Sequence, residues 1–216
     1  MKLKDLVLIG SGGLAREVLW HLNNENKQTR QYNIIGFVDN VPALKDKTVN
    51  GYPVLGNDQW LLDYEKEVCA AICIGDPNVR RSVYDKYRGK RNISFPVITA
   101  DDASYSETVH FGQGCIVCPS SALTVNITIG EFVIIDLHCT VSHDSVIDDF
   151  ATLHPGVNIA GNVHIGACAD IGIGTSIIQG RSIGENTVIG AGSVIVKDIP
   201  ANCTAVGVPA VPINTH

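Results

Sequence analysis

The sequence predicts a small α/β domain followed by a solenoid of short parallel β-strands. Two observations lead to this fold class. Strand-like and helix-like segments alternate over the first part of the chain, and aliphatic side chains then recur at every sixth residue over the second part. Such a change of period within a chain of 216 residues indicates two structural units. We therefore expect one domain over residues 1–98 and a second over residues 99–216.

The first domain is expected to contain a parallel sheet covered by helices. Apolar, strand-like runs occupy residues 6–10, 33–39 and 68–75. Amphipathic, helix-like segments occupy residues 10–23 and 77–87. Strands that alternate with helices along a chain are typical of a parallel sheet, because each crossover runs through a helix. The order of segments therefore predicts a small Rossmann-like domain.

A glycine-rich turn follows the first predicted strand. Gly10, Gly12 and Ala15 fit the pattern G-x-G-x-x-A, and Asp39 ends the second strand. In dinucleotide-binding folds this turn lets the backbone approach a pyrophosphate, and the acid binds a ribose hydroxyl. A domain of this size supplies only about one mononucleotide-binding half, so we expect a nucleotide joined to a smaller group. The alternative is that the glycines serve only a tight turn.

The solenoid is predicted from an unbroken six-residue repeat. This period fits neither an α-helix nor an alternating strand, but it fits short strands joined by regular turns. In each repeat the aliphatic side chain should point into a narrow core, and the small residue two positions earlier should face inward as well. The fourteen aliphatic positions are Val117, Leu123, Ile129, Ile135, Val141, Ile147, Leu153, Ile159, Ile165, Ile171, Ile177, Ile183, Ile189 and Ile195.

Composition and charge argue against several classes of function. The formal net charge of −6 argues against general nucleic-acid binding. The apolar runs are too short to cross a bilayer, and the N-terminal run ends in a glycine turn before it could form a signal peptide. The seven cysteines show no disulfide or zinc-finger spacing. We therefore expect a cytoplasmic protein with reduced thiols, no metal and no membrane insertion.

The six-residue repeat resembles the left-handed parallel β-helix, in which three hexads form one triangular coil. Together with the glycine-turn domain it resembles the bacterial sugar O- and N-acyltransferases, and within them the UDP-4-amino-sugar N-acetyltransferases of the bacillosamine pathway. The resemblance covers nearly the whole chain. The segments that carry it are LIGSGGLAREVL (8–19), FVDN (37–40), CIGDPNVRRSVYDK (73–86), TVSHDSVIDDFATLHPGVNIAGNVHIG (140–166) and AVGVPA (205–210).

The resemblance implies transfer of an acetyl group from acetyl-CoA to a nucleotide-linked amino sugar, with UDP-4-amino-4,6-dideoxy-N-acetylglucosamine as the expected substrate. It assigns the general base to His143, the support of that base to Asp144, and the N–H that binds the acetyl carbonyl to Gly161. An amine that attacks a thioester must lose a proton, which suits an imidazole, and a fixed N–H stabilises the developing oxyanion. The other implied contacts are Thr152, Ile173 and Ala191 for acetyl-CoA, and Gly12, Gly13, Leu14, Asp39, Asn40 and Gly75 for the nucleotide.

Two positions depart from the pattern of that family. Many members carry His after the glycine pair, where this chain has Leu14, so only backbone contacts are expected there. The bacillosamine-type enzymes also carry a second His near acetyl-CoA, at the position of Thr152. His154 is out of register with it, so we expect His154 and His138 to be corner residues at the surface or a subunit interface. The resemblance also implies a homotrimer with active sites between subunits.

Several alternative functions stay open at this point. The acceptor could be a hydroxyl, as in sialic acid O-acetyltransferases, or the amine of a dTDP- or GDP-linked sugar. His138 and His143 have the spacing of a histidine pair in the γ-class carbonic anhydrases, but Asp102 and Glu107 stand where the third histidine would be. The last alternative is a non-catalytic protein that binds a nucleotide sugar.

Overall fold

The computed structural model describes residues 3–28 and 31–216. By their contacts the residues divide into two compact units. The first unit comprises Met1–Gly75 and Val79–Pro96, and the second comprises Asp76–Asn78 and Val97–His216. The predicted division of roles, nucleotide-sugar binding in the first domain and acetyl transfer in the second, stays a prediction at this point.

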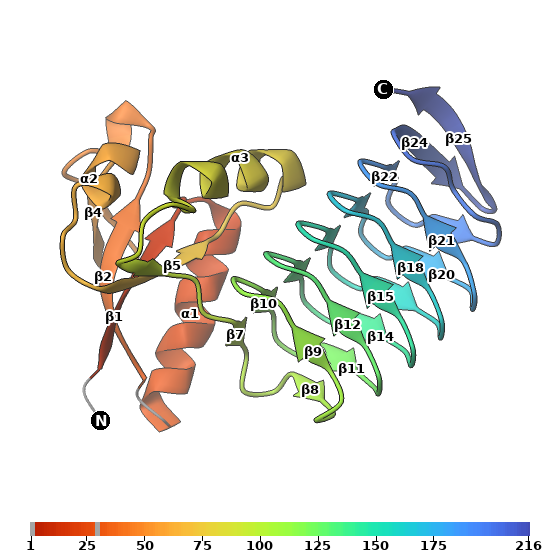
Figure 1. The fold of residues 1–216 in the computed structure, drawn as a ribbon, viewed down its shortest axis with the longest axis horizontal. Coiled ribbons are helices and arrows are strands. Elements are labelled where there is room, and N and C mark those ends of the chain that lie inside the picture. The colour runs from red at the N-terminus through yellow and green to blue at the C-terminus, as the bar shows by residue number, and fades with distance from the viewer. Residues whose placement is uncertain (1–2, 29–30) are drawn as a thin grey trace. The chain divides into compact units, whose positions relative to one another are not determined.

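The first unit contains a mostly parallel sheet with helices. Its elements are β1 (Lys4–Ile9), α1 (Gly13–Gln28), β2 (Tyr32–Val38), η1 (Pro42–Leu44), β3 (Thr48–Val49), β4 (Tyr52–Gly56), α2 (Asp58–Leu62), β5 (Val68–Ile72), α3 (Pro77–Tyr87) and β6 (Ile93–Ser94). The strand order is β3-β4-β2-β1-β5-β6, with β3 antiparallel to β4 (Figure 1). β1 pairs in parallel with β2 and β5, and β5 is buried along its whole length, as in sheets covered on both faces.

The expected strands and helices of this unit are present, and, besides the 3-10 helix η1, four short elements were not predicted. α1 continues to Gln28, beyond the predicted end at residue 23. The residues after 23 are polar, so the apolar periodicity that predicted the helix stops there although the backbone remains helical. The elements β3, β4, α2 and β6 have between two and five residues each. Segments of that length carry too few apolar positions to establish a period.

The second unit is a β-helix whose two-residue strands stack into three sheets (Figure 1). The first face consists of β7 (Ile98–Thr99), β10 (Ile116–Val117), β13 (Ile134–Ile135), β16 (Thr152–Leu153), β19 (Asp170–Ile171) and β22 (Val188–Ile189), followed by β24 (Cys203–Gly207) and β25 (Ala210–Thr215). The second face consists of β8 (Ser104–Tyr105), β11 (Ala122–Leu123), β14 (Thr140–Val141), β17 (Asn158–Ile159), β20 (Ser176–Ile177) and β23 (Val194–Ile195). The third face consists of β9 (His110–Phe111), β12 (Thr128–Ile129), β15 (Val146–Ile147), β18 (His164–Ile165) and β21 (Ser182–Ile183).

Each coil lies directly on the previous one. Val141 pairs with Ile159, and the same offset of 18 residues recurs in the parallel pairs from β7 to β23. We call the turns from the first to the second face the first corner, as at residues 154–157. The turns from the second to the third face, as at residues 142–145 and 160–163, form the second corner. This arrangement confirms the predicted fold class, an α/β domain followed by a hexapeptide β-helix.

The core of the solenoid is the column of aliphatic side chains that the repeat predicted, and all fourteen are buried. The small inward residues are buried too, and their hydroxyl groups donate to carbonyl oxygens of the turns. Ser121 Oγ donates to Asp136 O at 2.8 Å, Thr187 Oγ1 to Pro200 O at 2.8 Å, and Ser193 Oγ to Gly190 O at 2.7 Å. A buried hydroxyl needs such a partner, so serine and threonine fit here as well as alanine or cysteine.

The solenoid begins one coil earlier than the aliphatic repeat. The strands β7, β8 and β9 place Thr99, Tyr105 and Phe111 in the column of the repeat. At the other end β24 pairs with β22, and β25 folds back antiparallel on β24 to close the sheet. Within the described ranges no helix is long and apolar enough to cross a membrane.

The two residues of β15 allow a matched test of the solenoid core. Ile147 is 1% exposed and points inward, whereas its neighbour Val146 is 38% exposed. We expect Ile147→Ala to lower the free energy of unfolding by about 2–5 kcal/mol, because it leaves a cavity in a narrow core. Val146→Ala should change it by about 0.5 kcal/mol or less. Denaturant unfolding of both variants measures the difference, and equal losses would contradict the inward orientation of the repeat.

Candidate active site

His143 and Asp144 form a hydrogen-bonded pair at the second corner. His143 Nδ1 lies 2.8 Å from Asp144 Oδ2, and both side chains are about half exposed. Adjacent side chains on a flat strand point to opposite faces, so this contact requires a turn. Asp144 has a φ of 60°, in the left-handed region that aspartate tolerates better than most residues. The corner therefore turns two neighbouring side chains toward each other.

The coil before this corner holds Asp144 in place. Asn126 Nδ2 donates to Asp144 Oδ1 at 3.2 Å, and Asp144 N donates to Val125 O at 3.1 Å. The hydrogen bond with the His143 ring, and then that from Asn126, hold the pKa of Asp144 below its usual value. Asp144 is therefore a carboxylate near neutral pH. It fixes the proton of the neutral imidazole on Nδ1, which leaves the lone pair on Nε2.

Gly161 lies against the His143 ring in the next coil. The pairing of Val141 with Ile159 places residue 161 opposite residue 143. A Cβ atom added to Gly161 would lie 2.4 Å from both Cε1 and Nε2 of His143. Only glycine leaves room for the ring, so the nitrogen with the lone pair is next to the backbone of residue 161.

The predicted acetyl-CoA residues lie on another part of the solenoid. Thr152 is on the first face and buried, whereas Ile173 and Ala191 are at the first corner and exposed. Ile173 is 57% exposed, which is high for an isoleucine. The second face separates the two corners by roughly six residues, on the order of 15–20 Å. The structure therefore does not bring these residues to His143 within one chain.

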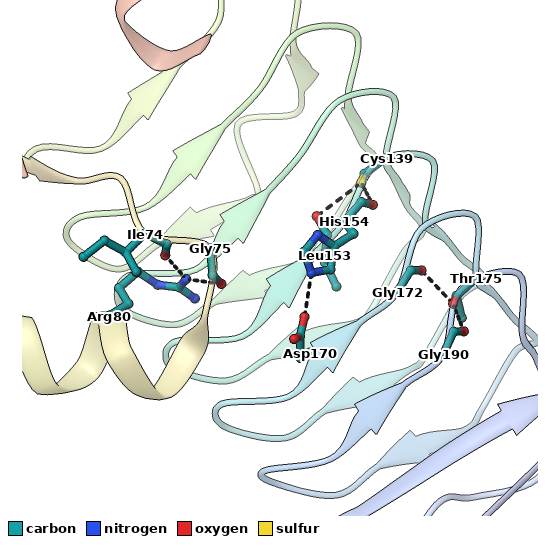
Figure 2. Close-up of polar contacts among 10 residues, drawn as sticks. All are labelled: Ile74, Gly75, Arg80, Cys139, Leu153, His154, Asp170, Gly172, Thr175 and Gly190. Carbon is teal, nitrogen blue, oxygen red and sulfur yellow. Dashed lines mark hydrogen bonds and ion pairs between the residues drawn. The ribbon is translucent and has the colours of Figure 1, made fainter. Parts of the chain in front are cut away.

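Two further histidines have carboxylate partners that were not predicted. His154 Nε2 lies 2.7 Å from Asp170 Oδ1, as Figure 2 shows. His164 Nε2 lies 2.8 Å from Asp148 Oδ2. In each pair the residues are 16 positions apart, two fewer than a full coil, so their side chains reach each other along one face. That spacing is visible in the sequence once the length of the coil is known.

A metal site is not formed by the candidate histidines within this chain. His138 is at the first corner and His143 at the second, so the pair with carbonic anhydrase spacing is not brought together. In residues 3–28 and 31–216 no group of three or more His, Cys, Asp or Glu side chains is placed to hold a metal ion.

Burial raises the pKa of Cys139 to about 12, so this thiol is not a ready nucleophile.

The predicted nucleotide residues meet at one edge of the sheet in the first unit. Ile9 pairs with Val38 on one side and with Ile72 on the other, so the carboxyl ends of β1, β2 and β5 lie side by side. Ligands of parallel α/β sheets bind at this edge. The residues that follow these three ends are Gly12, Gly13, Leu14, Asp39, Asn40 and Gly75.

Three glycines at this edge are not required by packing within the chain. A Cβ atom added to Gly12, Gly13 or Gly75 would meet nothing within 4 Å. Gly10 is different, because its φ is 93° and an added Cβ would lie 3.2 Å from Cys73 O. Gly10 therefore serves the tight turn, whereas at the other three the missing side chain leaves room for a ligand to approach the backbone.

Asp39 and Asn40 have structural partners at the same edge. Asp39 Oδ2 accepts from Ser11 N at 2.9 Å and from the Ser11 hydroxyl, and Oδ1 accepts from Val41 N at 2.9 Å. Asn40 Oδ1 accepts from Asp58 N at 3.1 Å. Asp39 thus ties the glycine turn to the end of β2. A carboxylate offers about four acceptor positions, so three bonds leave room for a ligand group.

Arg80 is a residue of this edge that was not predicted. It is 1% exposed, and its guanidinium donates to Ile74 O at 2.6 Å and to Gly75 O at 2.8 Å (Figure 2). The side chain is always charged and holds the carbonyl groups of the loop after β5. Its helical spacing could have indicated that Arg80 is buried, because Arg80 shares the buried face of α3 with Val83 and Tyr87.

Comparison with known sequences covers both units. The family model for the PglD N-terminal domain matches residues 5–87. The GDP-perosamine N-acetyltransferase of Escherichia coli O157:H7 is 31% identical to this chain over 211 residues, which cover 94% of this chain and 93% of that protein. The likeness therefore covers most of both units.

Solved structures agree over nearly the whole length. A histidine-to-asparagine variant of perosamine N-acetyltransferase from Caulobacter crescentus, in complex with CoA and GDP-perosamine, has a TM-score of 0.89 at 30% identity and covers 99% of this chain and 98% of that one. The acetyltransferase domain of PglB from Neisseria gonorrhoeae FA1090, in complex with acetyl coenzyme A, has a TM-score of 0.91 at 29% identity and covers 98% of this chain and 100% of that one. The chain therefore belongs to the family of sugar acyltransferases in which a PglD N-terminal domain precedes a β-helix of hexapeptide repeats.

Proposed function

We propose that this enzyme transfers the acetyl group of acetyl-CoA to the amine of a nucleotide-linked amino sugar. The observation that carries the proposal is the match to GDP-perosamine N-acetyltransferase over 94% of the chain. A match of that length spans most of both units, and the PglD N-terminal model over residues 5–87 includes the glycines at the edge of the sheet. A nucleotide-binding edge in the same chain favours a nucleotide-linked acceptor over a free sugar.

Two nucleotide sugars are candidates for the acceptor. UDP-4-amino-4,6-dideoxy-N-acetylglucosamine is the substrate that the sequence led us to expect. GDP-perosamine is the second candidate, because it is named for the E. coli relative and is bound in the C. crescentus structure. In both cases the proposed ligand contacts are the backbone at Gly12, Gly13, Leu14 and Gly75, and the side chains of Asp39 and Asn40.

His143 is the proposed general base. The amine becomes cationic as its bond to the acetyl carbon forms, and His143 Nε2 takes the proton. Asp144 holds Nδ1 at 2.8 Å, so the ring is fixed in the tautomer that presents Nε2. Because the ring also packs against Gly161, its freedom to rotate away is limited.

Gly161 is the proposed oxyanion donor. Its backbone lies beside His143 Nε2. The acetyl carbonyl oxygen can therefore accept a hydrogen bond from the N–H of residue 161 while the attacking amine gives its proton to His143. Transfer is then direct, and no cysteine is needed as a covalent carrier. Acetyl-CoA is held by the backbone near Ile173 and Ala191, whereas the side chain of Thr152 is 1% exposed and leaves no surface for this ligand.

The placement of these residues supports a homotrimer. The proposed base lies at the second corner, and the proposed acetyl-CoA contacts near Ile173 and Ala191 lie at the first corner of the same chain. Two sets of groups separated by the width of a face can share a site when they come from neighbouring subunits. A cyclic assembly of three chains repeats one such interface three times.

Removing the base should abolish most of the activity without unfolding the protein. We expect His143→Gln to lower kcat by about 10²–10⁴-fold, as for other general bases. Asp144→Asn should lower it by about 10–100-fold, and asparagine also tolerates the φ of this corner. The matched control is His164→Gln, which also removes a histidine from a histidine–aspartate pair and should leave kcat within about twofold. Release of CoA, followed with a thiol-reactive dye, measures all three, and full activity of His143→Gln would remove the base assignment.

A methyl group at residue 161 should act through the ring of His143. We expect Gly161→Ala to lower the melting temperature and kcat, because its Cβ would overlap Cε1 and Nε2 of that ring. In a His143→Ala background the same change should cost little stability, since the overlap is gone. Thermal unfolding of the two single variants and the double variant forms the cycle. Additive losses of stability would show that the clash lies elsewhere.

A panel of acceptors should distinguish the candidate substrates. We expect one nucleotide-linked amino sugar to give a rate of CoA release at least about tenfold higher than the others. The reason is that the proposed site at the sheet edge of the first unit contacts the nucleotide and can discriminate between its bases. The panel contains UDP-, GDP- and dTDP-linked amino sugars and free sialic acid. Turnover with sialic acid alone would replace the proposal by O-acetyl transfer. Binding of a nucleotide sugar without turnover in any arm would indicate a binding protein.

A further inference from the structure

The order of strands in the first unit indicates one ligand position at the edge of its sheet. The chain passes from β1 to β2 and β4 on one side of β1, and it then crosses to β5 on the other side. In parallel α/β sheets, ligands bind outside the carboxyl ends of the strands where the strand order reverses in this way. That position is bordered by the loop after β1 (residues 10–12) and by the β5 loop (residues 73–75). The two loops meet, because a Cβ atom added to Gly10 would lie 3.2 Å from Cys73 O.

Arg80 holds the β5 loop from inside the protein. It is 1% exposed, and its guanidinium donates to Ile74 O at 2.6 Å and to Gly75 O at 2.8 Å. Figure 2 shows the guanidinium directed at both carbonyl groups. Each peptide group is planar, so a hydrogen bond to its carbonyl oxygen restricts the orientation of the whole group. One side chain therefore orients two successive peptide groups beside the position where the strand order reverses.

The presence of a charged side chain here needs a physical reason, because burial of a charge costs free energy. A glutamine amide could donate to a carbonyl oxygen without that cost. Arginine differs from glutamine in that it is always protonated. Inside a protein, attraction between opposite charges several ångströms apart is stronger than in water. A ligand that carries negative charge at the β5 loop would therefore offset part of the cost of burying Arg80.

Gly75 gives such a ligand access to the β5 loop. A Cβ atom added to Gly75 would meet nothing within 4 Å, so the missing side chain leaves room for a ligand to approach the backbone. Arg80 itself is too deeply buried to touch a ligand. It can act on a ligand only through the loop that it holds and through its charge. In a nucleotide-linked sugar, the negative charge lies on the diphosphate.

We propose that Arg80 is a positioning residue of the nucleotide site, which holds the β5 loop in place and whose buried charge raises the affinity of that loop for the diphosphate of the nucleotide-linked sugar. This inference rests on the proposed function, because that function supplies the nucleotide-linked acceptor. It concerns the acceptor and leaves the affinity for acetyl-CoA unchanged, since the proposed acetyl-CoA contacts belong to the second unit.

Three substitutions separate the charge of Arg80 from its packing. Arg80→Gln keeps a donor and Arg80→Met keeps an apolar stem, but both remove the charge, whereas Arg80→Lys keeps it. The probes are UDP, GDP and dTDP, and the one that binds the wild-type protein most tightly is used throughout. We expect Arg80→Gln and Arg80→Met to raise its Kd by at least about tenfold, and Arg80→Lys by about threefold or less. Isothermal titration calorimetry measures Kd at a temperature below the thermal transition of every variant.

Two controls make the binding result specific. The nucleoside with the same base lacks the diphosphate, so its Kd, measured by NMR titration, should change by about twofold or less in the Arg80 variants. General damage to the site would weaken both ligands. Arg81 is the next residue of α3 but is exposed, so solvent screens its charge. Arg81→Gln should therefore leave the Kd of the diphosphate within about twofold of wild type.

Steady-state kinetics distinguish a positioning role from a loss of folded enzyme. In Arg80→Gln the KM for the nucleotide sugar should rise by about tenfold, while kcat and the KM for acetyl-CoA stay within about twofold of wild type. A smaller folded fraction would lower kcat and leave both KM values unchanged.

The outcomes separate this inference from the proposed function. Absence of diphosphate binding by the wild-type protein, an unchanged Kd in Arg80→Gln, an equal loss with the nucleoside, or an equal loss in Arg81→Gln would each overturn the role of Arg80. If Arg80→Gln and Arg80→Met do not fold, Arg80→Lys decides the question, and a loss of about tenfold or more in that variant would overturn it. Diphosphate binding that depends on Arg80, without CoA release by the wild-type enzyme with any acceptor, would instead count against acetyl transfer.

Discussion

Hydrogen bonding between successive coils is the constraint on which the rest of the solenoid depends. Ser142 N donates to Ile159 O at 2.9 Å, and Asn162 N donates to His143 O at 2.8 Å, so the chain on either side of the second corner is tied to the next coil. These bonds fix residue 161 opposite residue 143. The contact between an imidazole and a glycine backbone is therefore set by the backbone ladder, and the side chains only need to fit the space that it leaves.

The same constraint distributes the candidate chemistry over separate corners. A triangular coil cannot bring the first corner to the second, because a rigid strand lies between them. His143 and the glycine turns at residues 172–174 and 190–192 are consequently separate surfaces of one chain. In the first unit, by contrast, parallel pairing of β1 with β2 and β5 gathers three loop regions at one edge. The sheet thus brings the predicted nucleotide contacts together, whereas the solenoid keeps the predicted base and the predicted acetyl-CoA contacts apart.

Much of the fold and part of the candidate site could be predicted from the sequence. The six-residue period located the solenoid core, and the offset of one coil placed Gly161 above His143. The period did not reveal the first coil, because Thr99, Tyr105 and Phe111 are not aliphatic although they occupy the same column. A period detects apolar positions, whereas strand pairing depends on the backbone and accepts other side chains at the open end of the solenoid.

The contacts that were not predicted involve polar side chains. The bond between His154 and Asp170 depends on a spacing of 16 residues, which has no meaning until the coil length is known. Arg80 was not singled out because a charged residue in a helix is usually exposed, and its burial follows from the carbonyl groups of Ile74 and Gly75. Such contacts are set by tertiary structure, so local patterns do not encode them.

The left-handed backbone at Asp144 has a consequence for how this enzyme family can diverge. The same corner carries Asn126 and Asn162 with φ values of 55° and 56°, so the turn selects from a short list of residue types that includes aspartate and asparagine. The codons of these two residues differ by a single nucleotide. A lineage can therefore lose or regain the carboxylate beside His143 in one mutational step while the solenoid stays folded. Under the proposed mechanism, a conserved fold and a lowered activity are then compatible at this position, and weakly active paralogues can arise without passing through an unfolded intermediate.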